Sequence, residues 1–198
     1  MERKHEKYER LIAYCQELTP VPTAVAHPCD ESSLRGAVEA AELGILQPVL
    51  VGPRARIEAV AAQFQLDVSR YELVDAPHSH AAADLAVQLA REGKAEMLMK
   101  GSLHTDELMG AVVRSGTGLR TERRISHAFI MDVPSQDRPI IVTDAAINIF
   151  PTLEDKVHII QNAIDLAHAL GNEKPKVAIL SAMETINPKL QSTIEAGA

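Results

Sequence analysis

Small polar residues and a glycine follow the apolar run Met97–Met99, in the segment Lys100–Thr105. Thr105 opens an acidic stretch with apolar residues at helical spacing, so it is predicted to cap a helix. Amide groups at the start of a helix, backed by the positive end of its dipole, bind phosphate or carboxylate groups. A glycine lets the backbone approach such a ligand closely. Ser102, His104 and Thr105 are therefore candidates to hold a phosphoryl group, although helix capping explains the same residues.

Positive charge is concentrated just beyond this turn. The whole chain has a net charge of -7, yet four arginines fall within eleven residues: Arg114, Arg120, Arg123 and Arg124. Guanidinium groups bind phosphate and carboxylate groups through paired hydrogen bonds, so this cluster suits a highly anionic small ligand. We take Arg120 and Arg124 as candidate ligand contacts. For any one of these arginines, an ion pair at the surface is the competing interpretation.

Two further groups of polar residues stand where strands are predicted to end. Asp144 and Asn148 follow one apolar run, and Ser181 and Glu184 follow another. Ligands of open α/β sheets gather at the carboxyl ends of strands. Asp144, Asn148 and Ser181 are therefore candidate substrate contacts, although capping of a turn or helix explains such residues nearly as well.

The elements that position these residues alternate between short apolar runs and helical periodicity. This alternation predicts an α/β fold with a largely parallel sheet, because each parallel strand needs a crossover helix to reach the next. The predicted strands are Thr23–His27, Pro48–Gly52, Tyr71–Val74 and Ala95–Lys100. Helices are predicted over residues 2–18, from Asp30 to Gly44, from Pro53 to Phe64, from His78 to Glu92 and after Thr105. The first of these helices is expected to share one apolar face among Tyr8, Leu11, Ile12, Cys15 and Leu18.

A second domain is predicted to begin near Arg123, which divides the chain into residues 1–122 and 123–198. Two apolar runs separated by a polar turn predict a hairpin, and Thr152 with Asp155 resembles a capping box. In this domain the predicted strands are Ile125–Val133, Ile140–Asp144 and Val177–Leu180, with helices from Thr152 to Gly171 and after Pro188. Such a small sheet should leave apolar residues exposed over residues 140–149 and 177–183, which predicts self-association or capture of a partner chain.

Composition excludes several classes of protein. The chain has 198 residues, is 46% hydrophobic and has only six aromatic residues, so it can build a core but lacks the stacking surface of a nucleic-acid groove. Cys15 and Cys29 are too few for a disulfide scaffold or a four-thiolate zinc site, and the pair His78 and His80 has no further ligands nearby in the sequence. Nucleotide P-loop, dinucleotide and serine-hydrolase motifs are missing. Without a signal-like or membrane-spanning apolar run, we expect a cytoplasmic protein that binds neither membrane nor metal.

Several ordered blocks of sequence give a more specific indication. These blocks are KGSLHTDELM, GLRTERRISHAFIMDVP, IIVTDAAINIFPTLEDK and KVAILSAMET. They resemble the phosphate acetyl/butyryl transferase family, especially its phosphate butyryltransferase-like members and the acyltransferase domain of the enoyl-CoA hydratase/phosphate acetyltransferase type. The resemblance runs from about Tyr8 to Ala198. It implies an enzyme that transfers an acyl group between phosphate and coenzyme A, with these two molecules as substrates and no separate cofactor.

The same resemblance implies two α/β domains around a cleft, related to isocitrate and isopropylmalate dehydrogenases, with the second domain incomplete here. Family members continue beyond Ala198, and the Ser-Arg pair and Asp associated with catalysis lie in that further segment, so no catalytic residue is assigned. Acetyl-specific members also have an arginine early in the helix after the Ser102 turn, where this chain has Leu108-Met109-Gly110. The alternative interpretation is a non-catalytic or split half that binds an anionic ligand or a complementing chain.

Overall fold

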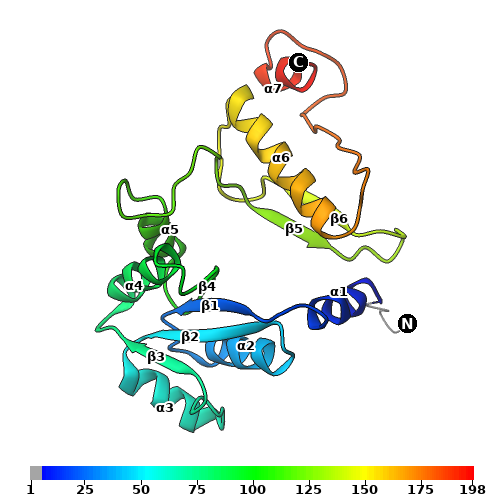
Figure 1. Ribbon diagram of the computed structural model, residues 1–198. Helices are drawn as coiled ribbons and strands as arrows, with labels where there is room; N and C mark the ends of the chain where they lie inside the picture. Colours follow the sequence, from blue (N-terminus) through cyan, green and yellow to red (C-terminus); the bar gives the residue numbers. More distant parts are fainter. Residues whose placement is uncertain (1–5) are drawn as a thin grey trace. The chain divides into compact units, whose positions relative to one another are not determined.

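The computed structural model describes residues 6–198 (Figure 1). Contacts divide this part of the chain into two units, one formed by Glu9–Thr121 and the other by Glu122–Ala198 with residues 6–8. The expected first helix is α1 (Glu6–Gln16), and residues 2–5 of that expectation lie outside the described residues. None of the residues in α1 is buried, and Tyr8 on its expected apolar face is 57% exposed.

The first unit is built on a four-stranded parallel sheet, as the alternation of strands and helices predicted. Its strands are β1 (Val21–Ala26), β2 (Leu46–Gly52), β3 (Glu72–Asp75) and β4 (Met97–Lys100), in the order β3-β2-β1-β4. All neighbouring strands pair in parallel. Each strand boundary lies within two residues of the predicted one. The carboxyl ends of β1 and β4 are adjacent, because Ala26 pairs with Lys100.

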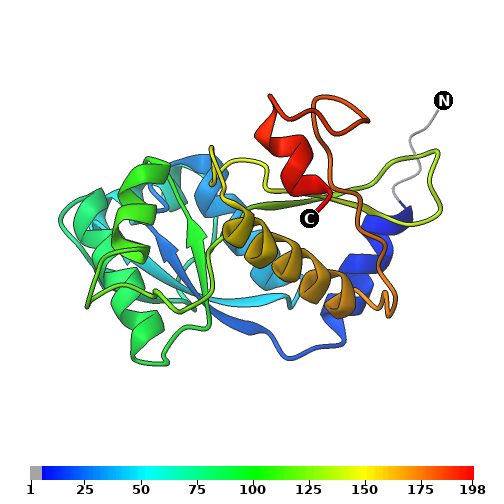
Figure 2. The same ribbon diagram turned by 90° about the horizontal axis from the view of Figure 1, so that it is seen from above.

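Helices cover both faces of this sheet. Figure 1 and, from above, Figure 2 show the elements concerned: α2 (Glu31–Glu42) and α3 (Arg54–Phe64) on one face, α4 (Ser79–Arg91) and α5 (Thr105–Val112) on the other. Side chains alternate along β1, so Val25 packs with the first pair of helices while Ala24 and Ala26 pack with the second. Helices on both faces are the arrangement that lets a parallel sheet bury its two surfaces.

The two core layers differ in the size of their side chains. Leu34, Leu50 and Ile57 are fully buried between α2, α3 and the sheet, and each contributes about 1.5–3 kcal/mol. The layer beneath α4 is instead dominated by alanine, with Ala82, Ala83 and Ala86 fully buried against Ala24 and Ala26. Small side chains let a helix lie close to a sheet, so α4 is held by close contact over many small groups.

Local signals account for the starts of most helices. The Asp30 carboxylate accepts a hydrogen bond from the Ser33 amide at 2.9 Å, as expected of the cap of α2. The expectation for α5 was wrong by one residue. His104 occupies the cap position, and Thr105 is the first helical residue. The Glu107 carboxylate accepts from the His104 amide at 3.0 Å, and this contact fixes the earlier start.

The second unit contains a hairpin and two helices. The hairpin of β5 (Ala128–Met131) and β6 (Ile140–Thr143) is antiparallel, α6 (Leu153–Ala169) packs against β6, and α7 (Gln191–Ala196) lies near the end of the chain. The capping box is confirmed, since Thr152 and Asp155 each accept the other's backbone amide. The predicted strand Val177–Leu180 is wrong: no described strand pairs with it, and an apolar run without a neighbouring edge cannot form a ladder.

Apolar side chains are exposed on this unit, as the sequence predicted. Ile149 is 82% exposed and Leu180 is 89% exposed. The pairs Phe129–Val142 and Met131–Ile140 lie opposite each other in the hairpin, so the alternation of strand residues places all four on one face. Each of the four is 42–52% exposed. A single two-stranded hairpin with one helix against it covers only one of its faces.

Gly101 and Gly110 provide a matched test of the packing at the end of β4. A Cβ at Gly101 would lie 2.4 Å from the Ala26 carbonyl oxygen, whereas a Cβ at Gly110 in α5 would meet nothing within 4 Å. We expect Gly101→Ala to reduce the free energy of unfolding by about 1–3 kcal/mol or more, because backbone must move. Gly110→Ala should increase it by about 0.5–1 kcal/mol, because alanine favours a helix. Urea unfolding measures both changes, and equal effects would contradict this account.

Candidate functional site

The backbone amides of the turn after β4 are already used within the protein. The Gly101 amide donates to the Ala26 carbonyl at 2.9 Å, and the Ser102 amide donates to the His27 carbonyl at 2.9 Å. These bonds extend the pairing of β4 with β1 beyond the last ladder residues. These two amides therefore have acceptors within the protein, because sheet formation takes up both donors.

The Ser102 side chain is held in the same way. Its hydroxyl donates to the His27 carbonyl at 2.9 Å and accepts from the Cys29 amide at 3.1 Å. His27 is only 5% exposed and has a φ of 55°, a left-handed backbone that is uncommon outside glycine. Its Nδ1 lies 3.2 Å from the Ser102 carbonyl. Ser102 therefore organises the carboxyl ends of β1 and β4 in this structure.

Groups open to a ligand begin one turn later, at the start of α5. His104 and Thr105 are exposed. The first amides of a helix have no intrahelical acceptor, and within residues 6–198 the Thr105 amide has no hydrogen-bond partner. Glu107 adds negative charge beside them, and its carboxylate accepts from the Ser79 hydroxyl at 2.9 Å. Burial raises the pKa of Glu107, but hydrogen bonds from Ser79 and the His104 amide outweigh this effect and lower it.

Three of the four clustered arginines form ion pairs. Arg114 lies 2.8 Å from Asp84, Arg123 lies 2.5 Å from Asp165, and Arg124 lies 3.2 Å from Asp155. Each of these three arginines therefore has an acidic partner within the protein. Arg120 is exposed, and in the described part of the chain it forms no ion pair. The guanidinium of Arg120 is therefore available for further contacts.

A surface hollow of about 530 Å³ lies elsewhere on the first unit. It is lined from α4 and from the residues that end and follow α5, including Arg91, Ala111 and Arg114. The acidic residues Asp84 in α4 and Glu92 just after it line the hollow as well. None of the candidate residues of the turn contributes to this hollow.

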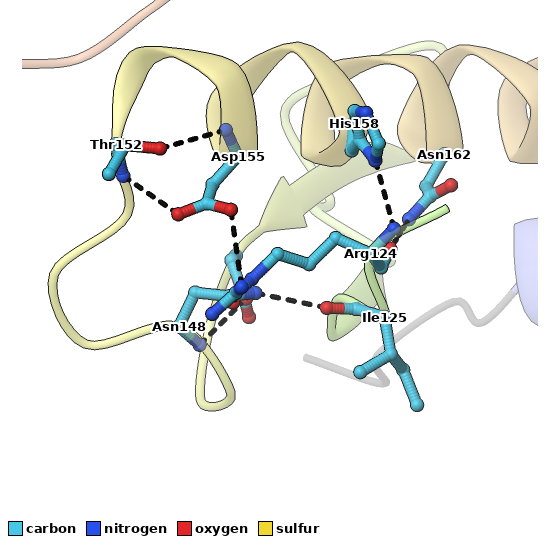
Figure 3. A network of polar contacts seen from close by, with 8 residues as sticks. Arg124, Ile125, Asn148, Thr152, Asp155, His158 and Asn162 are labelled. Atoms are coloured by element: carbon cyan, nitrogen blue, oxygen red, sulfur yellow. Dashed lines mark hydrogen bonds and ion pairs between the residues drawn. The ribbon is translucent and has the colours of Figure 1, made fainter. Parts of the chain in front are cut away.

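In the second unit, Arg124, Asp144 and Asn148 come together although they are spread over 25 positions of the sequence. Figure 3 shows the contact between Arg124 and Asn148. The Arg124 Nε donates to the Asn148 side-chain oxygen at 2.6 Å. The Asn148 amide group donates in turn to the Asp144 carboxylate and, at 3.0 Å, to the Ile125 carbonyl. Three residues predicted separately therefore form one hydrogen-bonded group.

The Asp144 carboxylate is the acceptor on which this loop is built. Backbone amides of His127, Ala146, Ile147 and Asn148 donate to it at 2.9–3.1 Å. Burial raises the pKa of Asp144, but the hydrogen bonds from Asn148 and from these amides outweigh this effect and lower the pKa to about 2. Asp144 is therefore ionised at neutral pH, where it orders the loop, and its low pKa makes it a weak base.

The remaining candidates make fewer contacts. The Ser181 and Ser192 hydroxyls lie 2.9 Å apart, and both Ser181 and Glu184 lie outside any strand. His80 Nδ1 lies 3.0 Å from Glu107, while His78 accepts from the Ala81 amide at 3.2 Å as a helix cap. Within residues 6–198, no group of three or more His, Cys, Asp or Glu side chains is arranged to hold a metal ion. The helices described are too short or too polar to cross a membrane.

Sequence reasoning missed residues of α6 that hold the Arg124 segment. His158 Nδ1 accepts from the Arg124 amide at 2.9 Å, and Asn162 donates to the Arg124 carbonyl at 2.9 Å. Together with Asp155 they are spaced by three and four positions, which is one face of a helix. That spacing was the available signal, but no role was predicted for His158 or Asn162, and Asp155 was predicted only as part of the capping box.

A parallel sheet with helices on both faces makes the first unit a doubly wound α/β structure. Comparison with known proteins is more specific. The model of the family described as phosphate acetyl/butaryl transferase matches residues 79–197, about three fifths of the chain. The chain belongs to this family.

Individual relatives extend the match over nearly the whole chain. A phosphate acetyltransferase from Rhizobium meliloti is 62% identical over 192 residues, which are 97% of this chain and 61% of that protein. A phosphate butyryltransferase from Clostridium acetobutylicum is 39% identical, over 91% of this chain and 60% of that protein. This chain therefore spans about three fifths of the length of these relatives.

Solved structures share the fold. A branched-chain phosphotransacylase from Enterococcus faecalis V583 aligns with a TM-score of 0.71 and 28% identity, over 88% of this chain and 61% of that chain. A phosphotransacetylase from Streptococcus pyogenes aligns with a TM-score of 0.75 over 95% of this chain and 67% of that chain. At 18% identity the second comparison bears on the fold alone.

Asp144→Asn tests the role of this hydrogen-bonded carboxylate through its dependence on pH. The folded-state pKa is depressed to about 2 from an ordinary value of 3.8, so the stabilisation is complete above the higher value and is lost as pH falls toward the lower one. At pH 7 we expect the variant to lose about 1 kcal/mol or more of unfolding free energy, because charged hydrogen bonds are weakened. The deficit should shrink between about pH 5 and pH 2. Asp137→Asn, in the exposed turn of the hairpin, is the control, and a deficit independent of pH would contradict the assignment.

Proposed function

We propose that this chain is part of a phosphate acyltransferase, which exchanges an acyl group between phosphate and coenzyme A. The observation that carries the proposal is 62% identity to the Rhizobium meliloti phosphate acetyltransferase over 97% of this chain. Identity at this level over nearly the whole chain supports a common chemistry. The acyl group is acetyl or butyryl, the two that appear in the names of the relatives.

The reaction requires three kinds of group. The coenzyme A thiol, with a pKa of about 8.5, transfers its proton to a base, and the thiolate sulfur attacks the carbonyl carbon of the acyl phosphate. The carbon–oxygen bond to phosphate then breaks, so a thioester and inorganic phosphate are formed. Donors must stabilise the charge on the carbonyl oxygen, and cations or amides must stabilise the departing phosphate. No additional cofactor is needed to balance this reaction.

The candidate residues divide into contacts and supports. Thr105 and His104 at the start of α5, with the exposed Arg120, are the proposed phosphate contacts of the first unit. Arg124 is the proposed anion contact of the second unit. Its side chain is 50% exposed despite the pairing with Asp155. Ser102, Asp144 and Asn148 act by fixing the loops that carry these contacts, and Ser181 remains a proposed contact for the acyl end.

The complete enzyme is proposed to have two α/β domains around a cleft, divided near residue 122, and to work in the cytoplasm. Because holding both substrates in line supplies about 7–11 kcal/mol, a cleft that is only partly formed should bind better than it reacts. No base is assigned among the described residues. Asp144, the carboxylate of the candidate loop, has a pKa of about 2 and is therefore a weak base.

A second proposed role is to bind another chain. The exposed apolar face of Phe129, Met131, Ile140 and Val142 favours this role, since contiguous apolar patches of this kind mark interaction surfaces. The partner would be a complementing polypeptide or a second copy of the chain. Sedimentation as a monomer at high concentration would contradict it.

Acyl transfer and ligand binding test the first proposal on the 198-residue chain. We expect measurable coenzyme A binding by calorimetry, but only weak phosphate-dependent release of coenzyme A from acetyl-CoA or butyryl-CoA. The Rhizobium meliloti enzyme is the positive control. Turnover of a few per second or more by this chain would show that the rest of the relatives' length is dispensable. Absence of coenzyme A binding and of any response to phosphate would contradict the proposal.

Ser102→Ala separates the two roles of the turn after β4. Removing the hydroxyl leaves the buried groups that it joins partly unsatisfied, so we expect a loss of about 1–3 kcal/mol in the absence of ligand. The further rise in melting temperature caused by phosphate or coenzyme A should also be smaller. Ser115→Ala, at an exposed position of the same unit, is the matched control. An unchanged ligand response in the less stable variant would remove this turn from the site.

A further inference from the structure

One face of α6 binds three different groups of a single arginine (Figure 3). The Asp155 carboxylate lies 3.2 Å from the Arg124 guanidinium. One turn along, His158 Nδ1 accepts from the Arg124 amide at 2.9 Å. At the next turn, Asn162 donates to the Arg124 carbonyl at 2.9 Å. The helix therefore holds both the backbone and the side chain of Arg124.

The opposite side of Arg124 is held by the loop that Asp144 orders. Asn148 accepts from the Arg124 Nε at 2.6 Å and donates to the Ile125 carbonyl at 3.0 Å. A guanidinium fixed at two of its nitrogens, with its own backbone fixed as well, loses little further conformational entropy when it binds an anion. This arrangement is more than a surface ion pair requires.

The contact with His158 determines the state of its ring. A backbone amide can only donate, so the Nδ1 that receives it must carry a lone pair, and the ring proton is on Nε2. The bond therefore requires an acceptor at the position of Nδ1. His158 is half-buried, and its neighbours Arg124 and Asp155 are the charged groups of this network.

Part of the guanidinium remains open. The Arg124 side chain is 50% exposed, and only Nε and one terminal nitrogen have partners. The other terminal nitrogen, Nη2, is unpaired among residues 6–198. Arginine binds phosphate through two parallel N–H donors of its planar guanidinium. The orientation of the guanidinium decides whether both donors can reach the anion.

We propose that His158 is a positioning residue, which holds the Arg124 backbone so that the guanidinium binds a phosphate group of a coenzyme A-type ligand. This inference rests on the proposed function for the identity of the ligand. His158 does not touch the ligand. It acts by placing the amide of Arg124 against α6, while Asp155 and Asn148 orient the end of the side chain.

Replacements of His158 separate positioning from a general effect on α6. His158→Ala removes the acceptor, and His158→Gln fills the space but places its amide one carbon too far out. His158→Asn retains a side-chain oxygen near the position of Nδ1 and should restore the bond. His168→Ala, at an exposed position on the same helix, is the control.

Coenzyme A binding and amide exchange are measured on the 198-residue chain at about pH 8, where imidazole side chains are generally neutral. We expect His158→Ala and His158→Gln to weaken binding about tenfold, comparable with one well-placed hydrogen bond. Arg124→Ala should weaken it at least as much, while His158→Asn and His168→Ala stay within about twofold of the unmodified chain. Hydrogen exchange at the Arg124 amide should accelerate in the two variants without the acceptor and remain slow in His158→Asn.

The outcomes distinguish this inference from the function on which it rests. Unchanged binding by His158→Ala or His158→Gln, with loss in Arg124→Ala, would overturn the positioning role and leave the proposed function standing. Failure of the unmodified chain to bind coenzyme A would count against the proposed function. In that case the Arg124 exchange rates still decide whether His158 holds this segment. If His158→Ala does not fold, His158→Gln provides the same comparison.

Discussion

The carbonyl oxygen of His27 is the acceptor on which the carboxyl edge of the parallel sheet depends. It receives the Cys29 amide, the Ser102 amide and the Ser102 hydroxyl, all at 2.8–2.9 Å. These bonds join the end of β1 to the end of β4 and set where α2 and α5 can begin. Gly101 permits the contact, because any side chain there would meet this backbone. A backbone amide without a partner among residues 6–198 is that of Thr105, in the first turn of α5.

In the second unit, side chains rather than backbone pairing hold a loop in place. Asp144 collects amides from its own loop and from His127, and Asn148 links that loop to Arg124. A carboxylate that accepts hydrogen bonds from several amides stays ionised and is held in one orientation. The loop and α6 thus contact Arg124 from two sides. The exposed donors of its guanidinium face solvent.

Periodicity predicted the fold well where the signal is local. The four parallel strands, the hairpin and the Thr152 capping box depend on residues close in sequence, and the structure confirms them. The use of the Ser102 amide could not be predicted, because its acceptor lies 75 positions earlier and only strand order brings the two together. Val177–Leu180 had the composition of a strand but no neighbour to pair with. The residues of α6 that hold Arg124 have the spacing of one helix face, which the sequence shows. The segment around Arg124 has no comparable signal.

The alanine layer beneath α4 gives this unit an uneven tolerance of change. Ala82, Ala83 and Ala86 are fully buried against the sheet, and an alanine side chain has no rotamer that could adjust to a change. A larger side chain at any one of these positions must move α4 away from the sheet. We expect such overpacking to reduce the free energy of unfolding by about 1–3 kcal/mol. A substitution at the interface of α4 with the sheet therefore requires a compensating substitution in a neighbour. The leucine and isoleucine side chains under α2 and α3 can instead adjust to single substitutions by changing rotamer.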